Sequence, residues 1–338
     1  ERARIAKRMA VIASDEMQDE TRALEAWKRA LRFVPDDPEV QEAITNLYQK
    51  TGKWHALVDF LNAQINQTEE AETDKKVALL FRLIEIYQDP ERIPSPDMVV
   101  KTYQRISDFS PTNIQALDSL AVEYEDRKRW RDLIQVLQKR IQVTEDALEL
   151  LELFMQVADL WIERMANPSQ AIPFLEQILS LDPDNLDVVR KLREIYRAKH
   201  NVEKLYESYE RELVLENNPQ LRKTILVELA NLAQNRLHDP NRAITYWEQV
   251  LQIDPESAPA LSALWALYTR YEQWTQMVAL VDQLLGGSEL SRKRQIELLE
   301  RKGRIMMSRL GQPDEARAVY GEILQIAPAN TSARNALR

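Results

Sequence analysis

The side chains in this sequence that could carry out chemistry are few, and their spacing argues against a reactive site. The three histidines, His55, His200 and His238, stand far apart, and none has a second histidine three or four residues away, as a zinc site on a helix would need. The chain has no cysteine, which excludes disulfides and thiolate metal sites. Glycine-rich phosphate loops and the Gly-x-Ser-x-Gly elbow of hydrolases are absent. The sequence therefore predicts no enzyme activity, no catalytic residue, no metal site and no cofactor.

The chain is organised instead by a repeated pattern that ends in a proline. That proline recurs with gaps of 76, 72, 72 and 73 residues, at Pro35, Pro111, Pro183, Pro255 and Pro328. Before each proline, three positions separated by four and three residues fall on one stripe of a helix. They hold Ala23, Val99, Ala171, Ala243 and Ala316, then Trp27, Tyr103, Leu175, Trp247 and Tyr320, then Ala30, Ile106, Ile178, Val250 and Ile323.

A second helix is predicted after each proline. Two residues on, each repeat has a side chain that can accept a hydrogen bond from the first turn of a helix, namely Asp37, Asn113, Asn185, Ser257 and Asn330. Nine and thirteen residues on, the apolar face continues with Ile44, Leu120, Leu192 and Leu264 and with Tyr48, Tyr124, Tyr196 and Tyr268. Every repeat thus marks its own helix start.

This pattern resembles the tetratricopeptide repeat (TPR), a pair of antiparallel helices that stacks on its neighbours. The small, aromatic, small and proline positions are similar to its second helix, and the tyrosine is similar to the first-helix tyrosine of the next repeat. The resemblance implies an all-α, right-handed solenoid superhelix of about nine stacked helix pairs, forming one continuous body over 1–338. The chain starts inside a helix, and we expect it to be a fragment of a longer protein. The expected pairs are 4–36, 37–70, 75–112, 113–147, 148–184, 185–219, 221–256, 257–288 and 292–329, with a tenth starting at 330.

The match to the family is uneven along the chain. Even-numbered pairs lack the closing proline and replace the family's alanine by Leu57, Leu133, Leu205 and Met277. The small residue of the first helix is mostly absent, with Arg193 and Trp265 at two such places. Asn167 and Pro168 are expected to cap and open a helix that Pro173 then bends. These departures affect the expected helix spacing and pitch, and leave the helix pairs in place.

The resemblance implies a long concave groove lined by first helices. Carried over position by position, the groove residues are Arg8, Glu42, Asn46, Asp118, Arg190, Glu194, Arg197, Arg236, Arg270 and Arg301. A solvated helix face would show the same mixture of charges. Co-chaperone repeats grip a C-terminal carboxylate with lysine and asparagine one turn apart, whereas Arg8 pairs here with Ile12, so such a clamp is not expected.

Recognition of another protein is therefore the function that the sequence favours. We expect a non-enzymatic scaffold that binds a peptide or helical segment of a partner protein in its groove, with no small-molecule substrate. An alternative is the substrate-recruiting arm of a larger enzyme whose catalytic domain lies outside this fragment. A third is an RNA-processing scaffold similar to half-a-tetratricopeptide (HAT) repeats, supported by seven basic and two acidic residues between Arg292 and Arg309.

Net charge and hydropathy limit which of these alternatives are compatible with the sequence. The net charge of −9 argues against nucleic-acid partners, because phosphate binding depends on clustered lysine and arginine. No run approaches the roughly 18 apolar residues of a transmembrane helix. We expect a soluble protein of unknown compartment, with the cytoplasm slightly favoured over the periplasm.

Overall fold

The computed structural model describes residues 1–69, 71–287 and 290–337, and within these ranges the chain forms nineteen α-helices and no strand. It divides into two compact units, Glu1–Asn167 and Pro168–Arg338. The all-α array of helix pairs predicted from the sequence is confirmed, and the bounds given for the individual pairs stay a prediction. The expected pairs 37–70 and 257–288 end on residues outside the described ranges. That the two units form one continuous right-handed solenoid stays a prediction.

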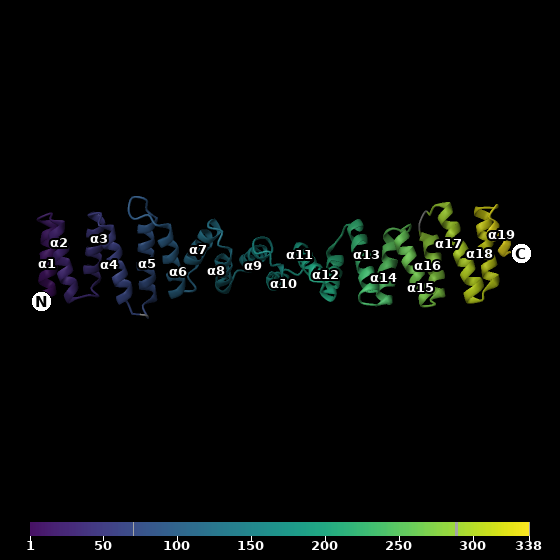
Figure 1. Cartoon of the computed structure of the whole chain (residues 1–338), viewed down its shortest axis with the longest axis horizontal. Coiled ribbons are helices and arrows are strands. Elements are labelled where there is room, and N and C mark those ends of the chain that lie inside the picture. Colours follow the sequence, from purple (N-terminus) through teal and green to yellow (C-terminus); the bar gives the residue numbers. More distant parts are fainter. Residues whose placement is uncertain (70, 288–289, 338) are drawn as a thin grey trace. The chain divides into compact units, whose positions relative to one another are not determined.

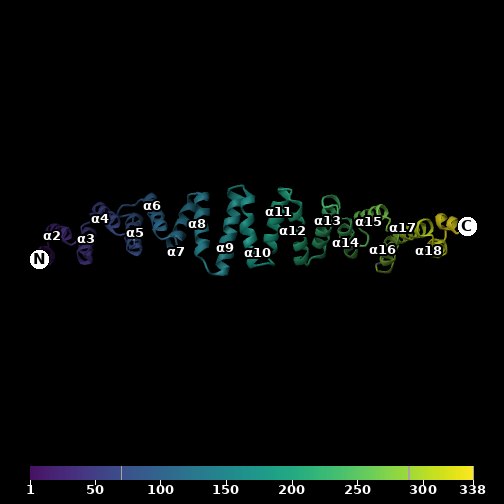
Figure 2. The same cartoon turned by 90° about the horizontal axis from the view of Figure 1, so that it is seen from below.

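In each unit, helices that follow one another in the chain pack against one another (Figures 1 and 2). The first unit contains α1 (Arg2–Asp15), α2 (Glu20–Phe33), α3 (Pro38–Lys50), α4 (Trp54–Gln67), α5 (Thr73–Gln88), α6 (Pro96–Phe109), α7 (Ile114–Asp126), α8 (Trp130–Val143) and α9 (Ala147–Asp159). The chain continues from α9 through a π-helical turn, Leu160–Arg164.

The second unit begins with a single 3₁₀ turn, Pro168–Gln170. Its helices are α10 (Ile172–Leu181), α11 (Leu186–Ala198), α12 (Val202–Leu215), α13 (Pro219–Asn235), α14 (Pro240–Ile253), α15 (Ala258–Arg270), α16 (Trp274–Gly287), α17 (Arg292–Ile305), α18 (Pro313–Ile326) and α19 (Thr331–Ala336). The expected helix start at Pro168 is wrong. Because α10 begins only at Ile172, Pro173 lies in the first turn, where its missing N–H would have no partner anyway.

The predicted cap residues begin the helices that follow the landmark prolines. Asp37 accepts a hydrogen bond from the Glu39 amide at 3.1 Å, and Asn113 accepts one from the Ala116 amide at 2.9 Å. Asn185 and Asn330 cap α11 and α19 in the same way. Ser257 occupies the cap position of α15 but makes no side-chain cap bond. Each side-chain cap contributes about 1 kcal/mol to its helix.

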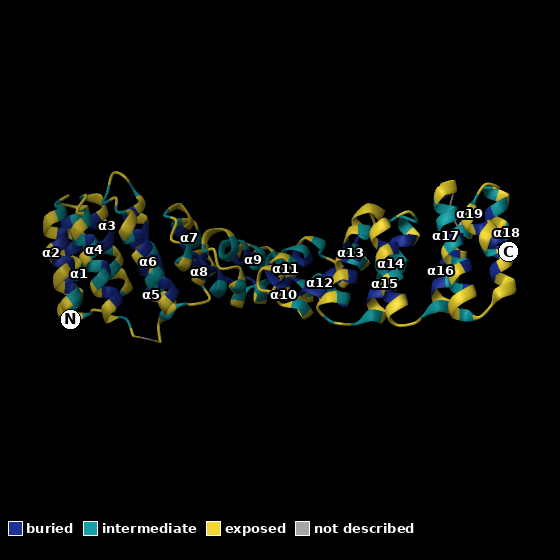
Figure 3. Cartoon of the chain, turned by 45° about the vertical axis from the view of Figure 1, so that its right-hand side comes forward, coloured by how far each residue is buried: buried dark blue, intermediate teal, exposed yellow. Residues whose placement is uncertain are grey.

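The landmark positions form the core. All of the apolar and tyrosine side chains predicted from the repeat are buried between helices, as the dark blue stripes of Figure 3 indicate. The tyrosines also hold a polar partner twenty residues earlier in the chain. Tyr124 accepts a hydrogen bond from Gln104 at 2.6 Å, and Tyr196 donates one to Glu176 at 3.0 Å. Burial, and then the bond to Glu176, raises the pKa of the Tyr196 hydroxyl.

Small residues allow the two helices of three odd-numbered pairs to approach closely. Ala10, Ala230 and Gly303 share one repeat position and are buried. A Cβ atom on Gly303 would lie 2.8 Å from Cζ of Tyr320, which packs directly over that glycine. The expectation that the small first-helix residue is mostly absent is therefore wrong for these pairs. It holds for two even-numbered pairs, in which Arg193 and Trp265 stand, and for α5 of the third pair, which has no small residue between Leu79 and Gln88.

Left-handed residues end many of the first helices. His200 and His238, which follow α11 and α13, have φ angles of 54° and 53°. Six further residues end helices in the same conformation, namely Gln18, Gly52, Lys128, Ala166, Glu272 and Gly311. This conformation lets the next backbone N–H groups bond to the last carbonyls of the helix.

Candidate functional site

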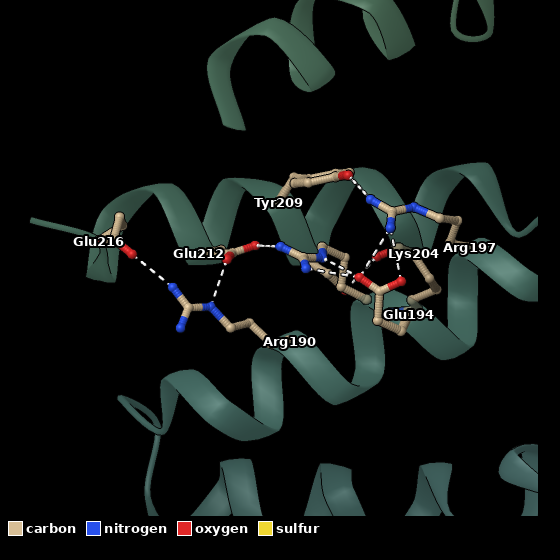
Figure 4. A network of polar contacts seen from close by, with 9 residues as sticks. Arg190, Glu194, Arg197, Lys204, Tyr209, Glu212 and Glu216 are labelled. Carbon is tan, nitrogen blue, oxygen red and sulfur yellow. Dashed lines mark hydrogen bonds and ion pairs between the residues drawn. The ribbon is translucent and has the colours of Figure 1, made fainter. Parts of the chain in front are cut away.

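Three of the predicted groove residues come together on α11 (Figure 4). Arg190, Glu194 and Arg197 are spaced by four and three residues, which places them on one face of this helix. The face packs beside α12, whose residues supply most of the partners described next. That these three residues contact a partner stays a prediction.

A buried carboxylate lies at the centre of the polar surface. The Glu212 side chain is only 3% exposed, and it accepts hydrogen bonds from Nε of Arg190 at 2.9 Å and from Nη1 of Arg193. Arg190 also donates to Glu216 at 2.7 Å. A carboxylate so far from water is costly unless charged donors satisfy it, and here two guanidinium groups do so.

The network continues along α11. Arg193 and Arg197 both donate to Glu194, each at 2.8 Å, and Arg197 also donates to the hydroxyl of Tyr209. Burial disfavours the charge on Arg193, but its hydrogen bonds to Glu194 and Glu212 outweigh that effect and raise the pKa of this guanidinium. The predicted groove residues here are thus held in place by partners within the chain.

The sequence prediction missed Arg193, Tyr209, Glu212 and Glu216 as members of this network. A signal for the central pair was present in the repeat. Arg190 and Glu212 are 22 residues apart, and exactly the same register holds Asp118 and Arg140 one repeat earlier, with the charges exchanged. In the first unit, Nε of Arg140 donates to Asp118 at 2.9 Å.

A cleft of about 520 Å³ opens beside Asp118 in the first unit. It lies over α8, between α7 on one side and α9 with its π-helical turn on the other. Apolar side chains line it, among them Val122, Leu133, Leu137 and Leu153. Carboxylates also line it, namely Asp118, Glu125, Glu149, Glu152, Asp159 and Glu163. Of these, only Asp118 was predicted as a site residue.

The other predicted groove residues do not join either cluster. Arg8 on α1 is exposed, as are Glu42 and Asn46 on α3. Arg236 follows the last residue of α13, and Arg270 lies 5.8 Å from the ring centre of Tyr271. The guanidinium of Arg301 stacks over Trp265, 5.0 Å from its ring centre.

Arginine over tryptophan is a recurring contact in the even-numbered pairs. The guanidinium groups lie 4.7 Å from the ring centre of Trp54, 5.4 Å from Trp130 and 5.0 Å from Trp274. Their arginines are Arg92, Arg164 and Arg309. At the equivalent register of the sixth helix pair, Val202 replaces the tryptophan and Arg236 is the matching arginine. This predicted groove residue therefore occupies a position that elsewhere joins neighbouring pairs.

No group of three or more acidic or histidine side chains within the described ranges could hold a metal ion. The helices of the described part of the chain are all too short or too polar to cross a bilayer. The helix pairs, their landmark cores and the polar faces of the first helices define the chain as an all-α repeat protein of TPR-like helix pairs.

Comparison with known proteins gives structural likenesses of low similarity. No family model and no curated protein matches the sequence. The P58(IPK) TPR domain is 16% identical with a TM-score of 0.28, and the match covers 99% of this chain and 95% of that one. YrrB, a TPR protein with an unusual peptide-binding site, is 14% identical with a TM-score of 0.29, covering 59% and 96% of the two chains. A tetratricopeptide repeat protein from Parabacteroides merdae is 13% identical with a TM-score of 0.28, covering 79% and 98%.

Proposed function

We propose that this chain is a non-enzymatic scaffold that binds a peptide or helical segment of a partner protein across the faces of its first helices. The cleft beside Asp118 is the observation that carries the proposal. Its volume of about 520 Å³ lies in the range of ligand-binding pockets, and its apolar lining includes Val122, which is 60% exposed. An apolar surface with polar walls gains free energy when a partner covers it.

The predicted groove residues have two roles in this proposal. Asp118 lies at the cleft and contacts the partner directly. Arg190, Glu194 and Arg197 form a surface that internal ion pairs hold fixed, so a partner that docks there would order few additional side chains. Charge on such a surface sets the register and the association rate more than the affinity. We propose Arg8, Glu42, Asn46, Arg236, Arg270 and Arg301 as peripheral contacts.

A peptide library displayed on phage tests the proposal. The immobilised chain should enrich peptides that share a sequence motif, and a synthetic peptide with that motif should bind the chain in solution. Val122→Gln places a polar side chain in the cleft and should weaken that binding, because the apolar contact is lost. A matched change on the outer surface, Val214→Gln, should leave it unchanged, since Val214 is 79% exposed on α12 in the second unit. Absence of any enriched motif would overturn the proposal.

The basic segment Arg292–Arg309 does not favour the RNA-binding alternative. Contacts within the protein engage four of its seven cations. Arg294 pairs with Glu297, Lys302 pairs with Asp282, and Arg301 and Arg309 stack over tryptophan rings. An electrostatic site for phosphates needs cations that are free to replace counterions.

A further inference from the structure

The geometry points to the chemistry of the partner: we propose that the cleft over α8 binds a basic amphipathic helix, with apolar side chains in one stripe and lysine or arginine on both flanks. This inference rests on the proposed function and specifies its occupant. The cleft has an acidic wall on each side and an apolar base, and a helix of that kind is complementary to both.

The two walls carry carboxylates at helical spacing. On α7, Asp118 and Glu125 are seven residues apart with Val122 between them, so all three face the cleft. On the opposite wall, Glu149, Glu152 and Glu163 follow one face of α9 and its π-helical turn. The stripe from Glu149 to Glu163 is about 21 Å long, which is the length of four helical turns.

Internal partners neutralise only part of this charge. Arg140, whose side chain is 10% exposed, pairs with Asp118 and Glu149 beneath the cleft. Glu125, Glu152 and Glu163 are exposed, and within the described ranges their carboxylates make no ion pair or hydrogen bond. Carboxylates gathered around an apolar cleft produce a negative potential that attracts cations and repels phosphates and acidic chains.

The repeat does not require these acids. Seventy-two residues later, in the second unit, Glu125 is replaced by Arg197, Glu152 by Thr224 and Glu163 by Asn235. The apolar positions of the base stay apolar or aromatic, with Leu205, Tyr209 and Ile225 in place of Leu133, Leu137 and Leu153. Helix packing thus explains why the base of the cleft is apolar. The carboxylates of its walls have no such structural role, because other residues stand at the equivalent positions 72 residues later.

A small polycation would satisfy the walls but leave the apolar base exposed to water. A neutral or acidic helix would cover the base but would leave carboxylates without partners, which costs free energy once water is displaced. An RNA would bring phosphates against carboxylates. Only a helix that combines both features satisfies the walls and the base together.

Fluorescence anisotropy with two labelled peptides of about 16 residues tests the inference, a length that gives four helical turns. In one peptide, leucines at i, i+4, i+7 and i+11 are flanked by lysines, and in the other the same leucines are flanked by glutamates. The lysine peptide should bind the whole chain at least ~10-fold more tightly than the glutamate peptide. Its affinity should fall several-fold between about 50 mM and about 300 mM salt, because the wall carboxylates are exposed.

Two triple variants distinguish the effect of charge at the cleft from the effect of the net charge of the chain. Glu125→Gln, Glu152→Gln and Glu163→Gln together should weaken lysine-peptide binding by ~10-fold or more, since three exposed charge contacts are lost. Glu203→Gln, Glu315→Gln and Glu322→Gln remove the same charge from exposed positions of the second unit and should change the affinity by less than about 2-fold. Circular dichroism checks that both variants keep their helix content.

Each outcome decides the inference. Equal losses in the two triple variants, or equal affinity for the two peptides, would overturn it. Enrichment of library peptides whose binding Val122→Gln weakens, together with no binding of the lysine peptide, would overturn this inference and leave the proposed function standing. Failure of the library to yield any motif would instead remove the proposed function itself.

Discussion

Replacement of Glu212 by glutamine should destabilise the second unit far more than any exposed ion pair would suggest. The glutamine keeps the volume of the side chain and removes its charge. The guanidinium groups of Arg190 and Arg193 would then face each other over a neutral amide at a site that is 3% exposed. Breaking a buried ion pair costs about 3–5 kcal/mol. Because Arg190 keeps Glu216 and Arg193 keeps Glu194, we expect the lower end, about 3 kcal/mol.

Hydrogen exchange of the α11 and α12 amides, together with urea denaturation, measures this effect. The local readout is needed because repeat arrays often do not unfold in one cooperative step. Glu207→Gln is the matched control on the same helix. Among the described residues Glu207 pairs only with Lys204, at 2.8 Å, and the two side chains are 60% and 49% exposed, so its loss should cost less than about 1 kcal/mol. Equal costs for the two variants would refute the argument from burial.

A fourfold variant that exchanges the positions of the two charges tests the same argument. Arg190→Asp, Arg193→Ala, Glu212→Arg and Glu216→Thr reproduce, in the second unit, the residues at the matching register of the first unit. Those residues are Asp118, Ala121, Arg140 and Thr144, and Arg140 bonds to both Asp118 and Thr144. The fourfold variant should recover at least half of the stability that Glu212→Gln loses. A further loss would show that the register alone does not specify the pair.

Three further predictions concern backbone strain, close packing and pH. His200→Gly should stabilise the second unit by about 1 kcal/mol in urea denaturation, because φ at this residue is 54° and the left-handed region is unfavourable for a residue with a Cβ; destabilisation would mean that the imidazole makes a contact worth more than the strain. Gly303→Ala should destabilise by about 1–3 kcal/mol, since its Cβ would lie 2.8 Å from Tyr320, whereas Gly321→Ala, with open space around it, should be neutral or slightly stabilising. Asp37→Asn keeps the α3 cap but removes the pairing with Lys7, whose hydrogen bond lowers the pKa of Asp37 below its ordinary value of 3.8. The carboxylate's contribution is present above that value and is lost as the pH falls through the lowered pKa, so the wild type should exceed the variant in stability at neutral pH, and urea midpoints should converge in acid. A constant difference at all pH values would contradict the assignment to this carboxylate.

The helix pairs could be predicted from the sequence because their signals are local and repeated. Burial at Ala23, Trp27 and Ala30 follows from a four-and-three spacing that any amphipathic helix shares, and the caps at Asp37 and Asn113 follow from side-chain chemistry within three residues. The small residues Ala10, Ala230 and Gly303 are harder to predict, because first helices of other pairs carry large residues such as Arg193 and Trp265 at this position.

The polar surface was harder to predict because its members are brought together by packing of one helix against the next. Arg190, Glu194 and Arg197 lie on one helix and share a visible spacing. Glu212 and Glu216 belong to the next helix, where a family template assigns no groove position.

The pairs Asp118–Arg140 and Arg190–Glu212 place the acidic and the basic residue in opposite order. Two repeats thus carry a pair of opposite charges at this register, and the net charge of each pair is zero. Because each pair is neutral, amino-acid composition does not indicate either polar surface. What differs is the set of neighbouring positions that the core does not constrain. In the first unit these positions carry Glu125, Glu152 and Glu163, and the cleft between them keeps its negative charge. If the proposed binding at this cleft is correct, recognition depends on positions at which the repeats differ while the core positions agree.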